Sequence, residues 1–191
     1  AGRGDILNTN SSAAITAVGK VQMQAQAGNI GNAATIASGT GADVLLTADG
    51  NIVNSGAIGS GRLVSFAAGS NISNTAAITA VDSITMTAGN DINNSDMLTA
   101  GSSVILTAGN DIGNTAVITA AEAITMEAAS DITSDGTLTA VKDVQLIADG
   151  GNINIDDGGT VTSKQGSINL VTKNTGAAGQ GAITVNAALD A

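Results

Sequence analysis

The chain has 191 residues, of which 43% are hydrophobic, and it contains no Pro, Cys or His. The hydrophobic fraction argues against disorder, and the absence of Cys excludes disulfides and thiolate metal sites. The formal net charge of −10 and the single aromatic residue, Phe66, exclude a nucleic-acid-binding surface, because phosphate backbones bind basic patches and stacking aromatic rings.

The first part of the chain, residues 1–49, predicts irregular coils of a repeat array. Each coil is marked by an Ile that follows Asp or Asn, and the first three markers, Ile6, Ile30 and Ile52, are spaced more widely than the markers that follow them. The extra residues fall shortly after the first marker and before Val44. We expect these insertions to lie in turns, where changes in loop length cost little free energy.

The next part, residues 50–150, is a regular repeat whose markers follow one another at an even spacing of about 20 residues. Apolar residues recur at the marker and at positions +6, +12, +14 and +16 from it in five successive repeats, which indicates one structural unit per repeat. The following large apolar residues of these columns are the predicted core: Ile72, Ile78, Ile84, Met86, Ile92, Leu98, Val104, Leu106, Ile112, Ile118, Ile124, Met126, Ile132 and Leu138.

Within one repeat, apolar and polar residues alternate, as in residues 83–88 (Ser-Ile-Thr-Met-Thr-Ala). This period of two is typical of β-strands and argues against a helical solenoid. Each repeat has room for three short strands: at the marker, at positions +6 to +8 and at positions +12 to +16. The sequence therefore predicts an all-β fold, a right-handed parallel β-helix with about 20 residues and three short strands per coil.

The last part, residues 151–191, keeps the pattern with looser spacing. Residues 168–170 and 183–185 are the strand candidates there. We expect residues 1–191 to form a single β-helix array of about eight or nine coils, roughly 40 Å long at the usual strand spacing. We also expect the chain to be a fragment of a longer protein, since it starts within the repeat pattern.

An Asn column accompanies the marker, two positions after it. An Asn that recurs at one corner of successive coils can form a ladder of side-chain amides along the axis of the helix. We interpret this column as structural rather than as a ligand site. In the regular coils the predicted ladder comprises Asn54, Asn74, Asn94 and Asn114.

Three carboxylates recur directly before the marker, at Asp91, Asp111 and Asp131, where other coils carry Asn. Asp and Asn both favour turns, so a solvated turn column is the favoured interpretation. A calcium ion that bridges the carboxylates is the alternative, because Ca²⁺ prefers oxygen ligands. We expect no other metal site and no cofactor.

A Thr column is expected on an outer face, at Thr79, Thr99, Thr119 and Thr139. A regular Thr array can bind ice, but a second face with Thr85, Thr87 and Thr125 is interrupted by Ile105, Glu127, Gln145 and Ile147. We therefore interpret these residues as β-branched residues on a pleated surface.

The tripeptide Arg3-Gly4-Asp5 has the sequence of the integrin-recognition motif. Gly4-Asp5-Ile6 also fits the Gly-Asn-Asp-Ile corner of the repeat itself, as at residues 89–92. We interpret the motif as a product of the repeat.

No catalytic constellation is recognisable in the sequence. Glycoside hydrolysis requires two carboxylates that flank a cleft, and nucleophilic catalysis requires a base beside the nucleophile. The chain has six scattered cations and no His, and its acidic residues recur mostly at the expected corners of coils. The sequence therefore does not predict an enzyme.

Residues 87–120, TAGNDINNSDMLTAGSSVILTAGNDIGNTAVITA, resemble the haemagglutinin-type repeats of filamentous haemagglutinin and related two-partner secretion exoproteins. The similarity covers about residues 4–155 and concerns the repeat pattern. The resemblance implies a fibrous, extracellular β-helix on the bacterial cell surface, exported through an outer-membrane secretion partner. No functional residue of the family maps onto this chain, and the Asn-Pro motifs of the family's secretion domain are absent from it.

The resemblance leads to the expected function: the structural shaft of a large surface adhesin or exoprotein, which mediates adhesion, biofilm formation or cell–cell contact by holding a tip domain away from the cell. Two alternatives stay open, a face that binds glycans, other polysaccharides or host-cell receptors directly and the stalk of a contact-dependent inhibition toxin. End-to-end self-association is a further expected contact, because terminal coils expose unpaired strand edges.

Overall fold

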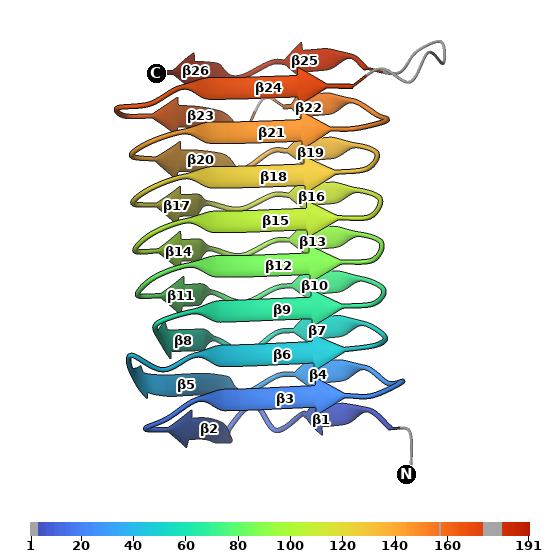
Figure 1. The fold of residues 1–191 in the computed structure, drawn as a ribbon, viewed down its shortest axis with the longest axis vertical. Coiled ribbons are helices and arrows are strands. Elements are labelled where there is room, and N and C mark those ends of the chain that lie inside the picture. Colours follow the sequence, from blue (N-terminus) through green and yellow to red (C-terminus); the bar gives the residue numbers. More distant parts are fainter. Residues whose placement is uncertain (1–3, 157, 174–180) are drawn as a thin grey trace.

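In the computed structural model the chain winds as a right-handed parallel β-helix (Figure 1). The structure describes residues 4–156, 158–173 and 181–191, and these residues form strands and turns with no helix. Each of the first eight coils contributes one strand to each of three sheets, named sheets A, B and C below, and the ninth contributes a strand to sheets A and B. All pairings among the described residues are between parallel strands. The predicted fold class is confirmed.

Sheet A contains the markers and has nine strands of three residues. Every strand begins with the marker Ile, and the register joins marker to marker, as in Ile72 with Ile92. The strands are β1 (Ile6–Asn8), β4 (Ile30–Asn32), β7 (Ile52–Asn54), β10 (Ile72–Asn74), β13 (Ile92–Asn94), β16 (Ile112–Asn114), β19 (Ile132–Ser134), β22 (Ile153–Ile155) and β25 (Ile183–Val185).

Sheet B follows sheet A along each coil and also has nine strands. In the regular coils the strands of sheet B contain the inward-pointing residue six positions after the marker, as Ile78 follows Ile72. The sequence predicts a strand at this position. The strands are β2 (Ala14–Ala17), β5 (Thr35–Thr40), β8 (Ile58–Gly61), β11 (Ile78–Ala80), β14 (Leu98–Ala100), β17 (Ile118–Ala120), β20 (Thr137–Ala140), β23 (Thr160–Ser163) and β26 (Ala188–Asp190).

Sheet C closes each coil with strands of five residues each, and these eight strands lie in front in Figure 1. Three of the five residues point inward, which gives the alternating burial of Ile84, Met86 and Ala88. The strands are β3 (Val21–Ala25), β6 (Val44–Ala48), β9 (Val64–Ala68), β12 (Ile84–Ala88), β15 (Val104–Ala108), β18 (Ile124–Ala128), β21 (Val144–Ala148) and β24 (Ile168–Thr172).

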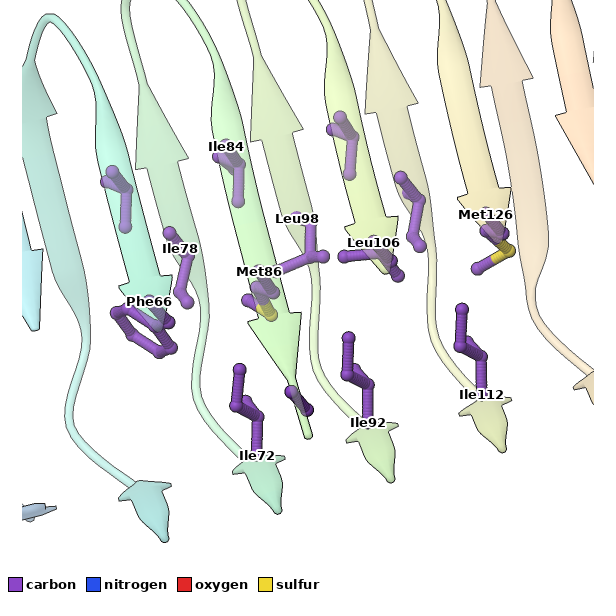
Figure 2. Close-up of a cluster of buried hydrophobic side chains, with 14 of the residues drawn as sticks. Phe66, Ile72, Ile78, Ile84, Met86, Ile92, Leu98, Leu106, Ile112 and Met126 are labelled. Atoms are coloured by element: carbon purple, nitrogen blue, oxygen red, sulfur yellow. The ribbon is translucent and has the colours of Figure 1, made fainter. Parts of the chain in front are cut away.

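The core is a narrow channel between the three sheets, filled by stacks of equivalent side chains (Figure 2). All of the side chains that the sequence places in the core are buried, each with at most 1% of its surface exposed. Phe66 occupies the same column as Met86 and Leu106 and is fully buried. Burial of apolar surface stabilises the fold by about 25 cal/mol per Å², so each added coil extends one continuous core.

The irregular coils place their extra residues mainly in turns. One of the two extra residues before Val44 instead lies inside β5, where the register with β8 shifts between Ala37 and Thr40. The other lies in the following turn, which contains Gly41 with a positive φ of 70°. Ala27, with φ of 58°, belongs to a lengthened turn after β3. The expectation that insertions lie in turns is thus correct except at β5, where a β-bulge absorbs one residue.

The C-terminal strand candidates are present as β24 and β25. Two further strands there, β23 and β26, were not predicted. Each has only one large apolar residue, Val161 or Leu189, and the lengthened turns place these residues outside the regular spacing of the repeat.

Candidate functional site

The Asn column lies inside the channel, where its amides form a ladder. Asn54 donates to Oδ1 of Asn74 at 2.7 Å, Asn74 to Asn94 at 2.8 Å and Asn94 to Asn114 at 2.8 Å. These four side chains are at most 1% exposed. A buried amide is costly unless it is hydrogen-bonded, and each of these residues has at least one partner because an adjacent coil carries the same residue.

The Asn ladder extends beyond the regular coils in both directions. Asn8 donates to Asn32, and Asn32 donates to Asn54, both at 2.8 Å. At the other end Asn114 donates to the Oγ of Ser134 at 3.4 Å and to the Ala116 carbonyl at 2.8 Å. The column is therefore a chain of hydrogen bonds that joins seven successive strands of sheet A, from β1 to β19.

A second ladder runs along the corner directly before the markers and is named the corner ladder. Here the Oδ1 of each Asp or Asn accepts the backbone N–H of the equivalent residue in the next coil, at 2.6 to 3.2 Å. For example, Asn71 accepts from the N–H of Asp91 at 3.1 Å. The acceptors, in order, are Asp5, Asn29, Asn51, Asn71, Asp91, Asp111, Asp131 and Asn152.

The corner ladder explains why Asp and Asn interchange at this position, since both supply the single oxygen that the next coil requires. Sequence reasoning identified the column only as a turn. The recurrence of Asp or Asn directly before each marker was the signal in the sequence. The atom that each side chain contacts depends on the geometry of the turn, which the sequence pattern does not give.

The three corner carboxylates bind protein donors. Oδ1 of Asp91 accepts from the Asp111 N–H at 3.2 Å and from Nδ2 of Asn110 at 2.7 Å. Oδ1 of Asp111 accepts from the Asp131 N–H at 2.9 Å, and its Oδ2 accepts from Asn110 at 3.1 Å. Among the described residues, no three side chains of His, Cys, Asp or Glu are grouped as a metal site. A calcium ion at this column stays a prediction.

The Arg-Gly-Asp motif lies only partly within the described residues, because Arg3 is outside them. Oδ1 of Asp5 accepts from the backbone N–H of Asn29 at 2.7 Å and from its Nδ2 at 3.0 Å. Asp5 is thus the first acceptor of the corner ladder.

The predicted Thr column is in register on the outside of sheet B. Thr79 pairs with Thr99, Thr99 with Thr119, and Thr119 with Thr139. The second Thr face lies on sheet C, where Thr85 is adjacent to Ile105 and Thr107 to Glu127. Thr139 also pairs with Thr162, so among the described residues the Thr column on sheet B is unbroken over five coils, whereas that on sheet C is interrupted.

Ion pairs join turns of adjacent coils at the exposed corners. Arg62 Nε donates to Asp43 Oδ1 at 2.7 Å, and the hydrogen bond from this guanidinium holds the pKa of Asp43 below its usual value, against the opposing effect of burial. Lys142 pairs with Glu122, and Lys173 pairs with Asp149 at 2.8 Å, which raises the pKa of Lys173. Each pair spans two coils, so these charges act as cross-coil contacts.

The outer faces carry shallow grooves, and three of them are formed by described residues. The first, named the sheet B groove, has a volume of about 380 Å³ and extends from Ser38 past Gly59 and Gly61 to Val81. It exists because Gly59 has no side chain in the column where other coils carry Thr, and the bulge of β5 forms its edge. The sequence did not lead us to predict this groove. The available signal was Gly59, which stands where the next coil carries Thr79.

The second groove, of about 420 Å³, lies along the edge of sheet C and is lined mainly by small residues such as Ala67 and Gly69. The third, named the polar groove, has a volume of about 230 Å³ and is lined by Asp143, Gln145, Ser167 and Asn169. The polar groove therefore offers a carboxylate, two amides and a hydroxyl on one face.

No family model matches the chain, and neither the curated proteins nor the solved structures contain a match. The described residues contain no helix that is long and apolar enough to cross a membrane.

Proposed function

We propose that this β-helix is the structural shaft of a large secreted bacterial surface protein. The observation that supports this proposal best is the continuity of the bonding along the axis. Adjacent coils are joined by parallel strand pairings in the three sheets, and the two side-chain ladders add further hydrogen bonds between most of them. The core also passes from coil to coil without a break.

A shaft must resist bending and pulling, and the ladders serve that purpose. Separation of two coils exposes apolar side chains and also leaves buried amides such as Asn74 and Asn94 without partners. An unpaired buried polar group costs about 1–3 kcal/mol. Because the cost recurs at each coil interface from β1 to β19, the stack has no single weak point within these coils.

The haemagglutinin-type repeat pattern supports the extracellular part of the proposal. On this account the parent protein leaves the cell through an outer-membrane secretion partner and then holds a tip domain away from the surface, for adhesion, biofilm formation or cell–cell contact. A toxin stalk would use the same shaft, because the ligand or toxin activity belongs to the tip. The proposal assigns no catalytic role to this chain.

Protease treatment of intact source cells tests the location. An immunoblot with antibodies against residues 4–156 should lose its signal after the treatment, while a cytoplasmic control protein stays intact. Protection equal to that of the cytoplasmic control would contradict a surface shaft.

A second candidate function is direct binding of a glycan, and the polar groove favours it. Side-chain amides, a carboxylate and a hydroxyl are the groups that hydrogen-bond sugar hydroxyls, and four such residues line this groove. Saturable binding of soluble polysaccharide that is weakened at least tenfold by Gln145→Ala would support it. Equal binding by the wild type and by Gln145→Ala would remove the polar groove from consideration.

A further inference from the structure

The chain contains only one kind of side chain that a mild two-electron oxidant readily attacks, the thioether of Met. Cys, His, Trp and Tyr are absent from the sequence, and Met occurs four times. Peroxide converts a Met thioether to a sulfoxide, and the reaction requires access of the oxidant to the sulfur. The exposure of the four Met side chains therefore decides where the chain is oxidised.

Three of the four Met side chains are buried. Met86 and Met126 lie in an inward column of sheet C and have no exposed surface, and Figure 2 shows both among the stacked side chains of the channel. Met23 is 8% exposed and belongs to β3, the strand at the N-terminal edge of sheet C. An oxidant reaches Met86 and Met126 only when coils separate, and such openings are rare in a well-packed core.

Met97 is the exception, with 43% of its surface exposed. It directly precedes Leu98, the first residue of β14, whose side chain points inward and is fully buried. The alternation of a β-strand places the Met97 side chain on the opposite, outer side. The next coil carries Val117 at the equivalent position, where it is 44% exposed, so the thioether stands beside another exposed apolar side chain.

The backbone around Met97 is held independently of its side chain. The Met97 carbonyl accepts the N–H of Ile78 at 2.9 Å, and the Met97 N–H donates to Oδ1 of Asp96 at 2.7 Å. Neither bond involves the sulfur, so oxidation of the thioether leaves both in place. A sulfoxide at Met86 would instead put an unpaired polar group into an apolar channel, at a large cost in stability.

We propose that Met97 is the oxidation site of this chain, where hydrogen peroxide converts the thioether to the sulfoxide while the coil stays folded. The sulfur donates an electron pair to one peroxide oxygen, the O–O bond breaks, and the other oxygen leaves as water with both peroxide protons. The sulfur loses two electrons, and the peroxide gains two. Hydrogen peroxide is uncharged, so the net charge of −10 does not repel it.

The reaction goes beyond the role of a shaft, because it gives the surface of the β-helix one place that responds to oxidants. Sulfoxide formation turns an exposed apolar side chain into a polar one. The core stays reduced, since its Met side chains are buried. Methionine sulfoxide reductases reverse the change with two electrons from a thiol reductant.

Mass spectrometry of the folded chain treated with hydrogen peroxide tests the site. The wild type should take up one oxygen atom quickly, and peptide fragmentation should place it on Met97. Met23 should follow, and Met86 and Met126 should react more slowly than Met97 by roughly tenfold or more, since their oxidation requires opening of the core. In concentrated urea all four side chains should react at similar rates. Equal rates for Met97, Met86 and Met126 in the folded chain would overturn the proposal.

Two matched variants separate the site from the fold. Met97→Leu should lose the rapid uptake of oxygen, and Met126→Leu should keep it. Leu already occupies the column of Met126 in both adjacent coils, at Leu106 and Leu146, so the control substitution fits the core. The wild type oxidised only at Met97 should keep the Tm of the untreated chain. Rapid uptake by Met97→Leu, or a lower Tm after oxidation of Met97 alone, would overturn the proposal.

Discussion

Asn74 donates a hydrogen bond from its side-chain amide to Oδ1 of Asn94 at 2.8 Å, in the interior of the β-helix. Both side chains are at most 1% exposed, so water cannot replace this bond. The same contact recurs from coil to coil, so the polar column contributes to cohesion along the shaft as the apolar columns do.

Removal of one amide from the column should destabilise the fold strongly. Asn94→Ala leaves Nδ2 of Asn74 and Oδ1 of Asn114 without partners, at about 1–3 kcal/mol for each group. We expect the free energy of unfolding, measured by urea titration, to fall by about 2–5 kcal/mol. Asn93→Ala is the control, since Asn93 is exposed in the same strand and should change stability by less than about 0.5 kcal/mol. Equal effects of the two substitutions would show that the ladder contributes nothing.

A charge in the marker column should lower the stability of the fold at least as much as the loss of one ladder amide. Ile112 is buried, with 1% of its surface exposed, and Ile112→Asp places an unpaired carboxylate in the channel. An uncompensated buried charge costs about 3–5 kcal/mol. Thermal melting followed by circular dichroism should therefore show a much lower Tm than for Thr115→Asp, where the new charge is exposed. A Tm equal to that of the parent would mean that the marker column is not interior.

The corner ladder predicts different effects for two substitutions of one residue. Asp111→Asn keeps the oxygen that accepts from Asp131 and removes a negative charge between two others, so the free energy of unfolding should stay equal or rise by about 0.5 kcal/mol. Asp111→Ala removes the acceptor and should cost about 1 kcal/mol. Urea titration of both variants distinguishes these outcomes, and a larger loss for Asp111→Asn than for Asp111→Ala would contradict the ladder.

The same column allows a direct test of calcium binding. If the corner carboxylates need only protein donors, 2 mM calcium (roughly the range of extracellular modules) should leave the Tm of the wild type equal to its Tm in a chelator. A rise in Tm that is lost in Asp111→Asn would instead establish the calcium alternative.

Acidification should weaken the contact between Asp43 and Arg62. The hydrogen bond from Arg62 lowers the pKa of Asp43 below its usual 3.8. A lowered pKa in the folded state contributes stability that is present above the unfolded pKa and is lost as the pH falls through the folded pKa. The Tm difference between the wild type and Asp43→Asn should therefore be largest near neutral pH and shrink below about pH 4. A difference that is constant from pH 2 to pH 7 would contradict this assignment.

The sequence predicts the regular coils well because one physical rule acts at every position. Strict alternation places Ile84 and Met86 inside, and the constant period of the repeat places equivalent residues in adjacent strands. No comparison between distant segments is needed, since each strand pairs with its neighbour in the repeat. The fold and the core could therefore be derived from spacing alone.

The remaining features depend on geometry that spacing does not encode. The bulge of β5 puts an extra residue inside a strand, where turn chemistry gives no signal. The corner ladder depends on which side-chain oxygen reaches the next coil, and the sheet B groove depends on Gly59 together with the bulge. β23 and β26 have too few apolar residues to be distinguished from turns.

Immunogold electron microscopy of the source cells, with antibodies against the chain, tests the proposed shaft most directly. The account predicts label along thin fibres that extend from the cell surface, or along released filaments, at a distance from the envelope. Label confined to the cytoplasm would contradict it.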